Sequence, residues 1–366
     1  MKKTSQLIII ISFVLFPSFK SLLAQSTINA FSKSERIVKK LIRKKQVPGL
    51  AITVSKNNKV LWSKGYGYSD LTNKTLVDPD KTVFRIGSVS KPIAAIGLLK
   101  IVEDSLMTLE SSIYNYVPYF PKKDYDITIK QLGGHLSGIR NYQGNEFKLN
   151  KPLDIREGIS LFANDSLLFQ PGTKYNYTSY NWNLISLAIQ ECTKIPFEDF
   201  VKYKVLIPFN MNKTFVDNNQ YIDGKAIFYK KIRKRHFKPV ENVNNYFKIA
   251  SGGYLSTSKD INIFGNALLN DSLVNPKQFK PFITAQKINN NDANSTYYGI
   301  GFQVSKDSSG RPYFGHIGNG LGGYGIFYVY PEQKVVLSIL TNTSNPNVDK
   351  KFNKLIDTLF DSINNL

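Results

Sequence analysis

The chain has 366 residues, of which 42% are hydrophobic and 20% are charged, and no long low-complexity tract interrupts them. This balance is ample for a well-buried core and excludes a disordered protein. A formal net charge of +21 is compatible with binding to nucleic acid or to an anionic membrane surface. Cys192 is the single cysteine, so no internal disulfide can form, and we expect it to be a buried apolar residue of a helix.

The N-terminal segment has the features of an export signal. Lys2 and Lys3 precede an apolar run over residues 7–16, and the small residue Ala24 follows. This order predicts a signal peptide over residues 1–24, cleaved after Ala24, and hence a periplasmic or secreted protein. The alternative is an uncleaved N-terminal anchor, although the apolar run is short for a membrane span.

Two clusters of basic residues contribute to the net charge. The first follows the polar face of a predicted amphipathic helix, and the second occupies a stretch that we interpret as a loop. Their members are Lys39, Lys40, Arg43, Lys44 and Lys45, and then Lys230, Lys231, Arg233, Lys234, Arg235 and Lys238. We expect both to be solvated surfaces. Contact with an anionic surface of the cell envelope is the alternative, and nucleic acid is disfavoured because export separates the protein from it.

The remaining elements follow from hydrophobic periodicity and turn residues. Asn57-Asn58 lies between two apolar or alternating segments and predicts a β-hairpin. The middle of the chain, residues 127–247, is predicted to be mostly helical with long loops. Predicted strands are 49–55, 59–64, 313–315, 324–330 and 335–341, and predicted helices are 88–104, 184–192, 197–205, 261–269 and a closing amphipathic helix over 348–363.

This order of elements predicts an α+β fold. Strands from both chain ends can share one antiparallel sheet flanked by helices, which gives an α/β sandwich with a mostly helical inserted lobe. A single domain is expected over residues 28–362. Its sheet lobe would be about 28–115 and 248–362, and its helical lobe about 116–247. A cleft between sheet and lobe would suit a small-molecule site.

The clearest chemical motif is Gly87-Ser88-Val89-Ser90-Lys91-Pro92, at the start of a predicted helix. Ser88 and Lys91 are three residues apart and therefore lie on one helix face. A serine hydroxyl is a weak nucleophile until a neighbour removes its proton, and a desolvated lysine can have its pKa lowered enough to help. The pattern S-x-x-K is common by chance, and a helix N-cap is the structural alternative for Ser88.

Two further motifs follow along the chain. Tyr177 and Ser179 precede a helical run, and a phenol next to an ammonium ionises more readily, so Tyr177 is a candidate general base. His316, Gly318 and Asn319 enter the terminal strands, where glycine permits a substrate to approach the backbone. The structural alternatives are a packing aromatic for Tyr177 and a buried, satisfied core histidine for His316.

Taken in order, the three motifs resemble the serine β-lactamase and penicillin-binding-protein superfamily. The resemblance is closest to the branch of class C β-lactamases, D-alanyl-D-alanine carboxypeptidases and related esterases. That branch carries S-x-x-K, then Y-x-N or Y-x-S, then K-T-G or H-x-G. The resemblance spans roughly residues 35–343. Similar surrounding segments are Val47-Pro48-Gly49, Lys64-Gly65-Tyr66-Gly67, Phe84-Arg85-Ile86-Gly87, Leu136-Ser137-Gly138-Ile139, Gly252-Gly253-Tyr254-Leu255-Ser256-Thr257 and Tyr298-Gly299-Ile300-Gly301.

The resemblance implies roles for these residues in acyl transfer. Ser88 would be the acylated nucleophile, Lys91 its activating partner and Tyr177 the general base and later acid. Backbone N–H groups of Ser88 and Asn319 would form the oxyanion hole. The residues alone leave open whether Lys91 or Tyr177 takes the first proton. The implied reaction is hydrolysis of an amide, ester or peptide bond in a small-molecule or peptide substrate.

Two departures from the pattern affect the expected substrate. Ser179 stands where the best-known β-lactamases have Asn, and His316 stands where they have Lys, so an amide contact and a fixed positive charge are missing. Both changes disfavour efficient penicillin hydrolysis and favour carboxypeptidase or esterase activity. Ser179, His316 and Gly318 would support the substrate. The alternative function is a non-hydrolytic penicillin-binding-like sensor that uses the same cleft.

No metal or organic cofactor is implied. His135, His236 and His316 are too scattered for a metal site. The stretch over residues 318–323 matches G-x-G-x-x-G, but strands follow it, whereas a dinucleotide site needs a helix there. The oligomeric state is left open.

Overall fold

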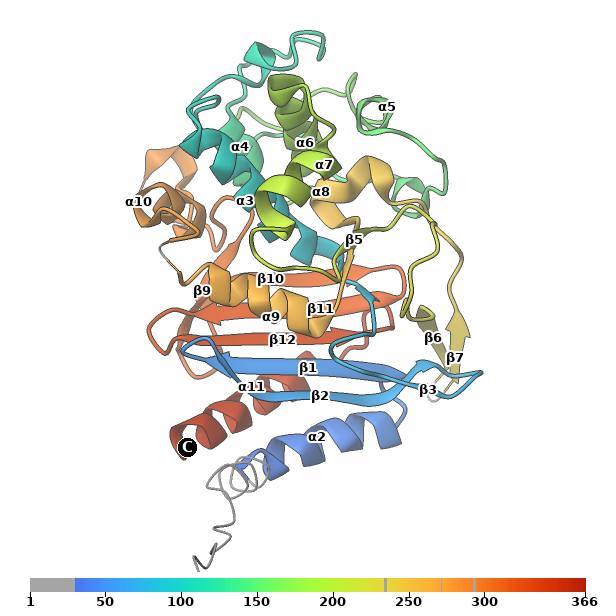
Figure 1. Cartoon of the computed structure of the whole chain (residues 1–366). Helices are drawn as coiled ribbons and strands as arrows, with labels where there is room; N and C mark the ends of the chain where they lie inside the picture. Colours follow the sequence, from blue (N-terminus) through green and yellow to red (C-terminus); the bar gives the residue numbers. More distant parts are fainter. Residues whose placement is uncertain (1–29, 234–235, 271, 292–293) are drawn as a thin grey trace, which may run out of the picture.

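The computed structural model describes residues 30–366 of the protein, apart from residues 234–235, 271 and 292–293 (Figure 1). The predicted signal peptide lies outside these residues and stays a prediction. Within the described part of the chain, no helix is long and apolar enough to cross a membrane.

A seven-stranded antiparallel sheet forms the centre of the fold. Its strands are β1 Gly49–Lys56, β2 Lys59–Asp70, β3 Thr75–Leu76, β9 Gln303–Lys306, β10 Pro312–Gly320, β11 Gly323–Tyr330 and β12 Val335–Thr341. They lie in the order β3-β2-β1-β12-β11-β10-β9, so the pairing of β1 with β12 joins the two ends of the chain, with Ile52 opposite Ile339. Asn57 and Asn58, with φ angles of 50° and 61°, make the tight turn of the predicted hairpin.

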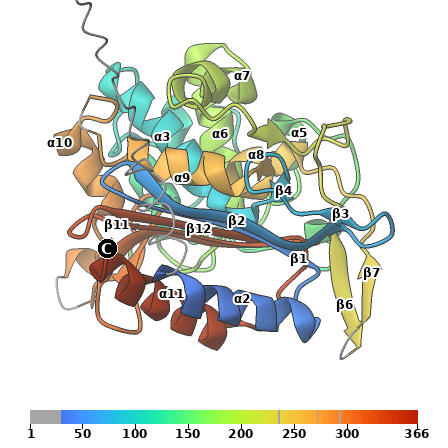
Figure 2. The ribbon, with the colours of Figure 1, turned by 60° about the horizontal axis from the view of Figure 1, so that its bottom comes forward.

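Helices cover both faces of this sheet (Figure 2). On one face lie α2 (Ser32–Arg43) and α11 (Asp349–Asn364), which confirms the predicted closing helix, and on the other lies α9 (Ser258–Ala267). Leu337 and Ile339 of β12 join the apolar cluster with α2 and α11, whereas Val336 and Leu340 join the cluster with α9. Because successive side chains of a strand point to opposite faces of the sheet, the apolar residues of β12 contribute to the clusters on both faces.

The remaining helices form a lobe on the α9 side of the sheet (Figure 1). They are α3 Ser90–Glu103, α4 Ile129–Gly133, α5 Ile155–Ile159, α6 Tyr180–Thr193, α7 Phe197–Val201, α8 Ile249–Gly252 and α10 Pro276–Phe279. α3 is buried on almost every side, which accounts for its mostly apolar sequence. Cys192 lies in α6 but is half-buried rather than buried. The predicted α+β fold is confirmed, whereas the domain and lobe boundaries stay predictions.

Four residues of the second basic cluster lie on a pair of antiparallel strands, so the loop expected for them is wrong, whereas Lys234 and Arg235 lie outside the described residues. β6 (Tyr229–Arg233) pairs with β7 (His236–Pro239) at one side of the molecule (Figure 2). Tyr229 anchors the hairpin: its N–H donates to the carbonyl of Asn342 at 3.0 Å, and its hydroxyl accepts a hydrogen bond from the N–H of Leu71 at 2.9 Å. The other residues of β6 are exposed, so the strand lacks the apolar alternation that reveals a strand in sequence.

Candidate active site

Ser88 lies in a single 3-10 turn, η1 (Gly87–Val89), between the short strand β4 (Phe84–Arg85) and α3. The sequence predicted Ser88 as the first residue of the helix, but α3 begins at Ser90. The Ser88 side chain caps neither segment, so the N-cap alternative is wrong. Helix capping therefore does not explain why a serine occupies position 88.

Two glycines allow this turn to pack against β10. Gly87 has a φ of +51°, and a Cβ there would lie 2.9 Å from the backbone N of Asn319. At Gly318, a Cβ would lie 1.9 Å from the carbonyl oxygen of Ile86. Gly318 therefore permits a close approach between β10 and the turn that carries Ser88, and the approach of a substrate to this glycine stays a prediction.

The structure brings Ser88, Lys91, Tyr177 and Ser179 together. Lys91 Nζ lies 3.0 Å from Ser88 Oγ, and the Tyr177 hydroxyl donates a hydrogen bond to the same oxygen at 2.8 Å. Ser179 Oγ lies 3.4 Å from Lys91 Nζ. Ser88 comes from η1, Lys91 from the start of α3, and the other two residues from the segment before α6. A hydroxyl between two such groups can lose a proton to one and be oriented by the other.

Lys91 is fully buried among neutral groups. Besides Ser88 and Ser179, its Nζ contacts the carbonyl oxygen of Ser251 in α8 at 2.6 Å. Burial in this uncharged setting lowers the pKa of Lys91 well below its usual value. A deprotonated amine can accept a proton, so this environment prepares Lys91 to act as a base.

Tyr177 is enclosed by other rings. The His135 and Tyr298 rings lie 4.4 Å and 5.9 Å from its centroid. Desolvation raises the pKa of Tyr177, and the hydrogen bond with Ser88 opposes this only in part. The sequence suggested that an adjacent ammonium would promote ionisation of Tyr177. Because burial disfavours the ammonium form of Lys91, that effect is weakened, and desolvation favours the protonated phenol.

His316 lies within the wall of the site and is 1% exposed. Its Nδ1–H donates to the carbonyl of Ile317 at 2.7 Å, since a carbonyl can only accept, and its Nε2 therefore accepts from the Tyr298 hydroxyl at 2.9 Å. Burial, together with the nearby Lys91, lowers the pKa of His316 to about 3. The geometry thus favours the satisfied core histidine, and the role of His316 towards a substrate stays a prediction.

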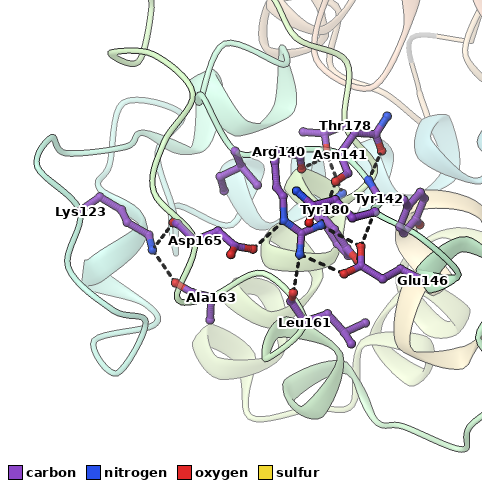
Figure 3. Close-up of polar contacts among 12 residues, drawn as sticks. Lys123, Arg140, Asn141, Tyr142, Glu146, Leu161, Ala163, Asp165, Thr178 and Tyr180 are labelled. Atoms are coloured by element: carbon purple, nitrogen blue, oxygen red, sulfur yellow. Dashed lines mark hydrogen bonds and ion pairs between the residues drawn. The ribbon is translucent and has the colours of Figure 1, made fainter.

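Arg140 fixes the loop that lies against the Tyr177 segment (Figure 3). Its Nη1 and Nη2 contact the two carboxylate oxygens of Glu146 at 2.8 Å and 3.0 Å. The Thr178 hydroxyl donates to the carbonyl of Arg140 at 2.7 Å, and the Tyr180 hydroxyl donates to Glu146 at 2.8 Å. Thr178 and Tyr180 are thereby tied to this loop, which holds the segment that carries Tyr177.

Several residues of the site escaped sequence reasoning. His135 is too isolated in the sequence to suggest a role, yet its buried ring packs on Tyr177. Burial lowers the pKa of His135 well below its usual value, so the ring is neutral. Ser251 directly precedes a segment that resembles the family, and Tyr298 begins another, but they act through a backbone carbonyl and a buried hydroxyl. The spacing of residues in the sequence does not predict such contacts.

A narrow pocket opens beside Ser88. Its lining residues are Arg85, Gly87, Ser88, Tyr142, Phe147, Ser179, Val243, Asn245, Lys248, Ser251, Gly252, Asn319, Gly320 and Leu321. A larger cavity, of about 900 Å³, lies beside α4 and contains none of them, so we assign the chemistry to the narrow pocket. Among the described residues, no group of three or more His, Cys, Asp or Glu side chains is placed to hold a metal ion.

Sequence comparison places the chain in a known family. A family model described as Beta-lactamase matches residues 34–360. The human "Serine beta-lactamase-like protein LACTB, mitochondrial" is 28% identical over 293 residues, which cover 61% of this chain and 53% of the relative. The chain thus spans about half the length of the curated relatives it matches.

Solved structures show the same β-lactamase/transpeptidase-like fold. The D-amino acid amidase from Ochrobactrum anthropi SV3 superposes with a TM-score of 0.78 at 19% identity, covering 92% of this chain and 99% of the amidase. The octameric penicillin-binding protein homologue from Pyrococcus abyssi gives a TM-score of 0.73 at 22% identity, covering 86% of this chain and 73% of the homologue.

Proposed function

The chain belongs to the β-lactamase family, and we propose that it is a serine hydrolase that forms an acyl-enzyme on Ser88. The observation that carries this proposal is the convergence of Lys91 Nζ, at 3.0 Å, and the Tyr177 hydroxyl, at 2.8 Å, on Ser88 Oγ. A serine with an adjacent base is an activated nucleophile. The similarity in fold to an enzyme described as a D-amino acid amidase supports amide hydrolysis in general.

In the proposed first step, the neutral amine of Lys91 takes the Ser88 proton while Ser88 Oγ attacks the carbonyl carbon. The lowered pKa of Lys91 and the raised pKa of Tyr177 favour Lys91 over Tyr177 as this base. The backbone N–H groups of Ser88 and Asn319 are the proposed oxyanion hole. Donors of this kind contribute about 3–4 kcal/mol each to stabilisation of the transition state.

Tyr177 then gives its proton to the leaving amine or alcohol, and the proton held by Lys91 replaces it. Water attacks the acyl carbonyl in the second half of the reaction, with Lys91 again taking a proton. Ser88 Oγ leaves and is reprotonated, and a carboxylic acid is released. Tyr177 acts as an acid before it acts as a base, which fits a phenol whose surroundings favour the protonated form.

The proposed substrate is an amide, peptide or ester rather than a penicillin. Buried His316 is neutral and supplies no positive charge to a β-lactam carboxylate, and the short Ser179 side chain offers no amide group. A site with a neutral His316 and a short Ser179 side chain suits carboxypeptidase or esterase activity better than efficient β-lactamase activity.

Intact-mass spectrometry during turnover of p-nitrophenyl acetate tests the proposal. We expect a transient acetyl adduct on the wild-type protein and none on Ser88→Ala, with thermal unfolding showing that the variant is folded. Equal turnover by the two proteins would contradict Ser88 as the nucleophile. An adduct that forms but is never released would favour the sensor function instead.

A further inference from the structure

A buried lysine lines the same pocket as Ser88. Lys248 is 5% exposed and immediately precedes α8. Its Nζ donates to the carbonyl of Phe147 at 2.7 Å. The same atom lies 5.6 Å, 5.0 Å and 5.3 Å from the ring centroids of Tyr142, Phe147 and Phe247. The ammonium is thus held by one carbonyl and by aromatic faces, all of them neutral.

Positive charge exceeds negative charge around this lysine. Arg85, which also lines the pocket, makes a buried ion pair with Asp217, with its Nε 2.6 Å from Oδ2. Lys225 Nζ lies 3.2 Å from the other oxygen of Asp217. One carboxylate therefore serves two cations, and Lys248 remains as a third. A buried charge without a counter-ion is costly, so a ligand that brings a carboxylate would stabilise this arrangement.

The pocket lies on the acyl side of the reaction. Ser88 and Ser179 belong to its described lining, but Tyr177 does not. Under the proposed function, Tyr177 protonates the leaving group, which therefore departs on the Tyr177 side of Ser88. The part of the substrate that stays on Ser88 then occupies the pocket with Lys248.

We propose that Lys248 binds an anionic group of the substrate, and that the enzyme acts on amides or esters whose acyl group ends in a carboxylate. This inference rests on the proposed function and names the substrate class of that site. An acyl group that carries an ammonium, as an amino acid amide does, would meet like charge in this pocket.

The test compares two matched esters, mono-p-nitrophenyl adipate and p-nitrophenyl hexanoate, whose acyl chains differ only in the terminal carboxylate. Acylation is followed by intact mass and by release of p-nitrophenol, with Ser88→Ala as the blank for spontaneous hydrolysis. The measured quantity is the ratio of kcat/KM for adipate to that for hexanoate. We expect the wild type to prefer adipate and Lys248→Met to lower the ratio about 10- to 100-fold, the range for loss of a hydrogen bond to a charged group.

Two variants control for other effects of the substitution. Lys248→Arg keeps the charge and should recover part of the preference. Lys148→Met removes a positive charge from an exposed position on the neighbouring loop and should leave the ratio unchanged. If both esters acylate Ser88 but the wild-type ratio is near one, or Lys248→Met leaves it unchanged, the inference is overturned while the proposed function stands. If neither ester acylates Ser88, the proposed function is contradicted, and so is the inference that depends on it.

The pH dependence supplies a second measurement. Burial and the neighbouring Arg85 lower the pKa of Lys248 to about 8, and Asp217 acts in the opposite direction. Tyr142 faces the same ammonium, and burial raises the pKa of Tyr142 to about 12, so Tyr142 stays neutral. The preference for adipate should therefore decline as the pH rises through about 8. A preference that stays constant from pH 6.5 to 9.5 would contradict binding of the carboxylate by the Lys248 ammonium.

Discussion

The Nζ of Lys91 lies 2.6 Å from the main-chain carbonyl oxygen of Ser251, nearer than the 3.0 Å that separates it from Ser88 Oγ. A carbonyl supports a buried amine by hydrogen bonding but carries no charge that would hold its proton. The partner that fixes Lys91 in place therefore leaves its pKa low, which is the state that a base for Ser88 requires.

The first prediction concerns stability and the substitution Lys91→Met. The unfolded chain, with the ordinary lysine pKa, binds more protons than the folded chain between the two pKa values. The wild type should therefore gain stability relative to the variant as the pH rises through that window towards 10.5, by about 1.4 kcal/mol per pH unit. Denaturant unfolding of both proteins at pH 7 and 9.5 measures the difference. A difference that does not change with pH would show that folded Lys91 keeps its proton.

A second prediction separates the acid and base roles of Tyr177. If Tyr177 protonates the leaving group, Tyr177→Phe should slow amide hydrolysis about 10²- to 10⁴-fold, because an amine leaves only when it is protonated. Hydrolysis of p-nitrophenyl esters should fall much less, since p-nitrophenolate leaves without a proton. The comparison is made by steady-state kinetics with one acyl group on both leaving groups. An equal loss for both substrates would indicate that Tyr177 acts in the attack by Ser88 instead.

A third prediction follows from the contact between β10 and the nucleophile turn. In Gly318→Ala, the new Cβ would meet the carbonyl oxygen of Ile86 at 1.9 Å, so the strand or the turn must move. We expect a loss of about 3 kcal/mol in unfolding free energy, at the upper end of overpacking costs, together with a loss of activity. Gly320→Ala is the matched control, because its Cβ would meet Gly87 Cα at an ordinary 3.8 Å. Similar unfolding midpoints for the two variants would contradict this account.

A fourth prediction concerns the Arg140 network. Arg140→Met leaves the carboxylates of Glu146 and Asp165 without their shared cation, whose Nε lies 2.6 Å from Asp165. Because both carboxylates are partly exposed, we expect destabilisation of about 1–3 kcal/mol, less than for a wholly buried pair. The value of kcat should fall because the segment that carries Tyr177 loosens.

Arg140→Lys should rescue little of this loss, since an ammonium cannot reproduce the two-pronged contact with Glu146. Adding Glu146→Gln to Arg140→Met should recover part of the stability but not the activity. Chemical denaturation and kinetics on these three variants and on Glu146→Gln alone test this. Additive losses in the double variant would show that Arg140 and Glu146 are not coupled.

The fifth prediction concerns contact of the basic hairpin with an anionic envelope surface, which the sequence left as the alternative to a solvated face. The hairpin variant changes Lys230, Lys231, Arg233 and Lys238 to Gln, and the control changes Lys39, Lys40, Arg43 and Lys44 of the α2 region to Gln, so both lose the same charge. Binding to vesicles that contain anionic lipid should weaken more in the hairpin variant, by about 1 kcal/mol per residue, and should fall with salt. Equal weakening in both variants would attribute the binding to net charge alone.

Much of the fold was predictable because turn residues and the spacing of apolar residues along the sequence indicate individual strands and helices. Asn57-Asn58 predicted the turn between β1 and β2. Two apolar segments predicted β11 and β12, and the helical spacing of the C-terminal apolar residues predicted α11. The hairpin of β6 and β7 was missed because its strands face solvent on almost all positions, and periodicity reports only burial on one face.

The sequence by itself determined which side chains would meet: the spacing of Ser88 and Lys91, and the motif around Tyr177, named the groups that converge on one hydroxyl oxygen. Only the tertiary structure decided how strongly those groups are desolvated and which of them line the pocket beside Ser88. His316 is buried, and Lys248, which is distant in the sequence, lines the same pocket as Ser88. Spacing records neighbours along a helix or strand, whereas desolvation and access depend on through-space partners that only the folded chain assembles.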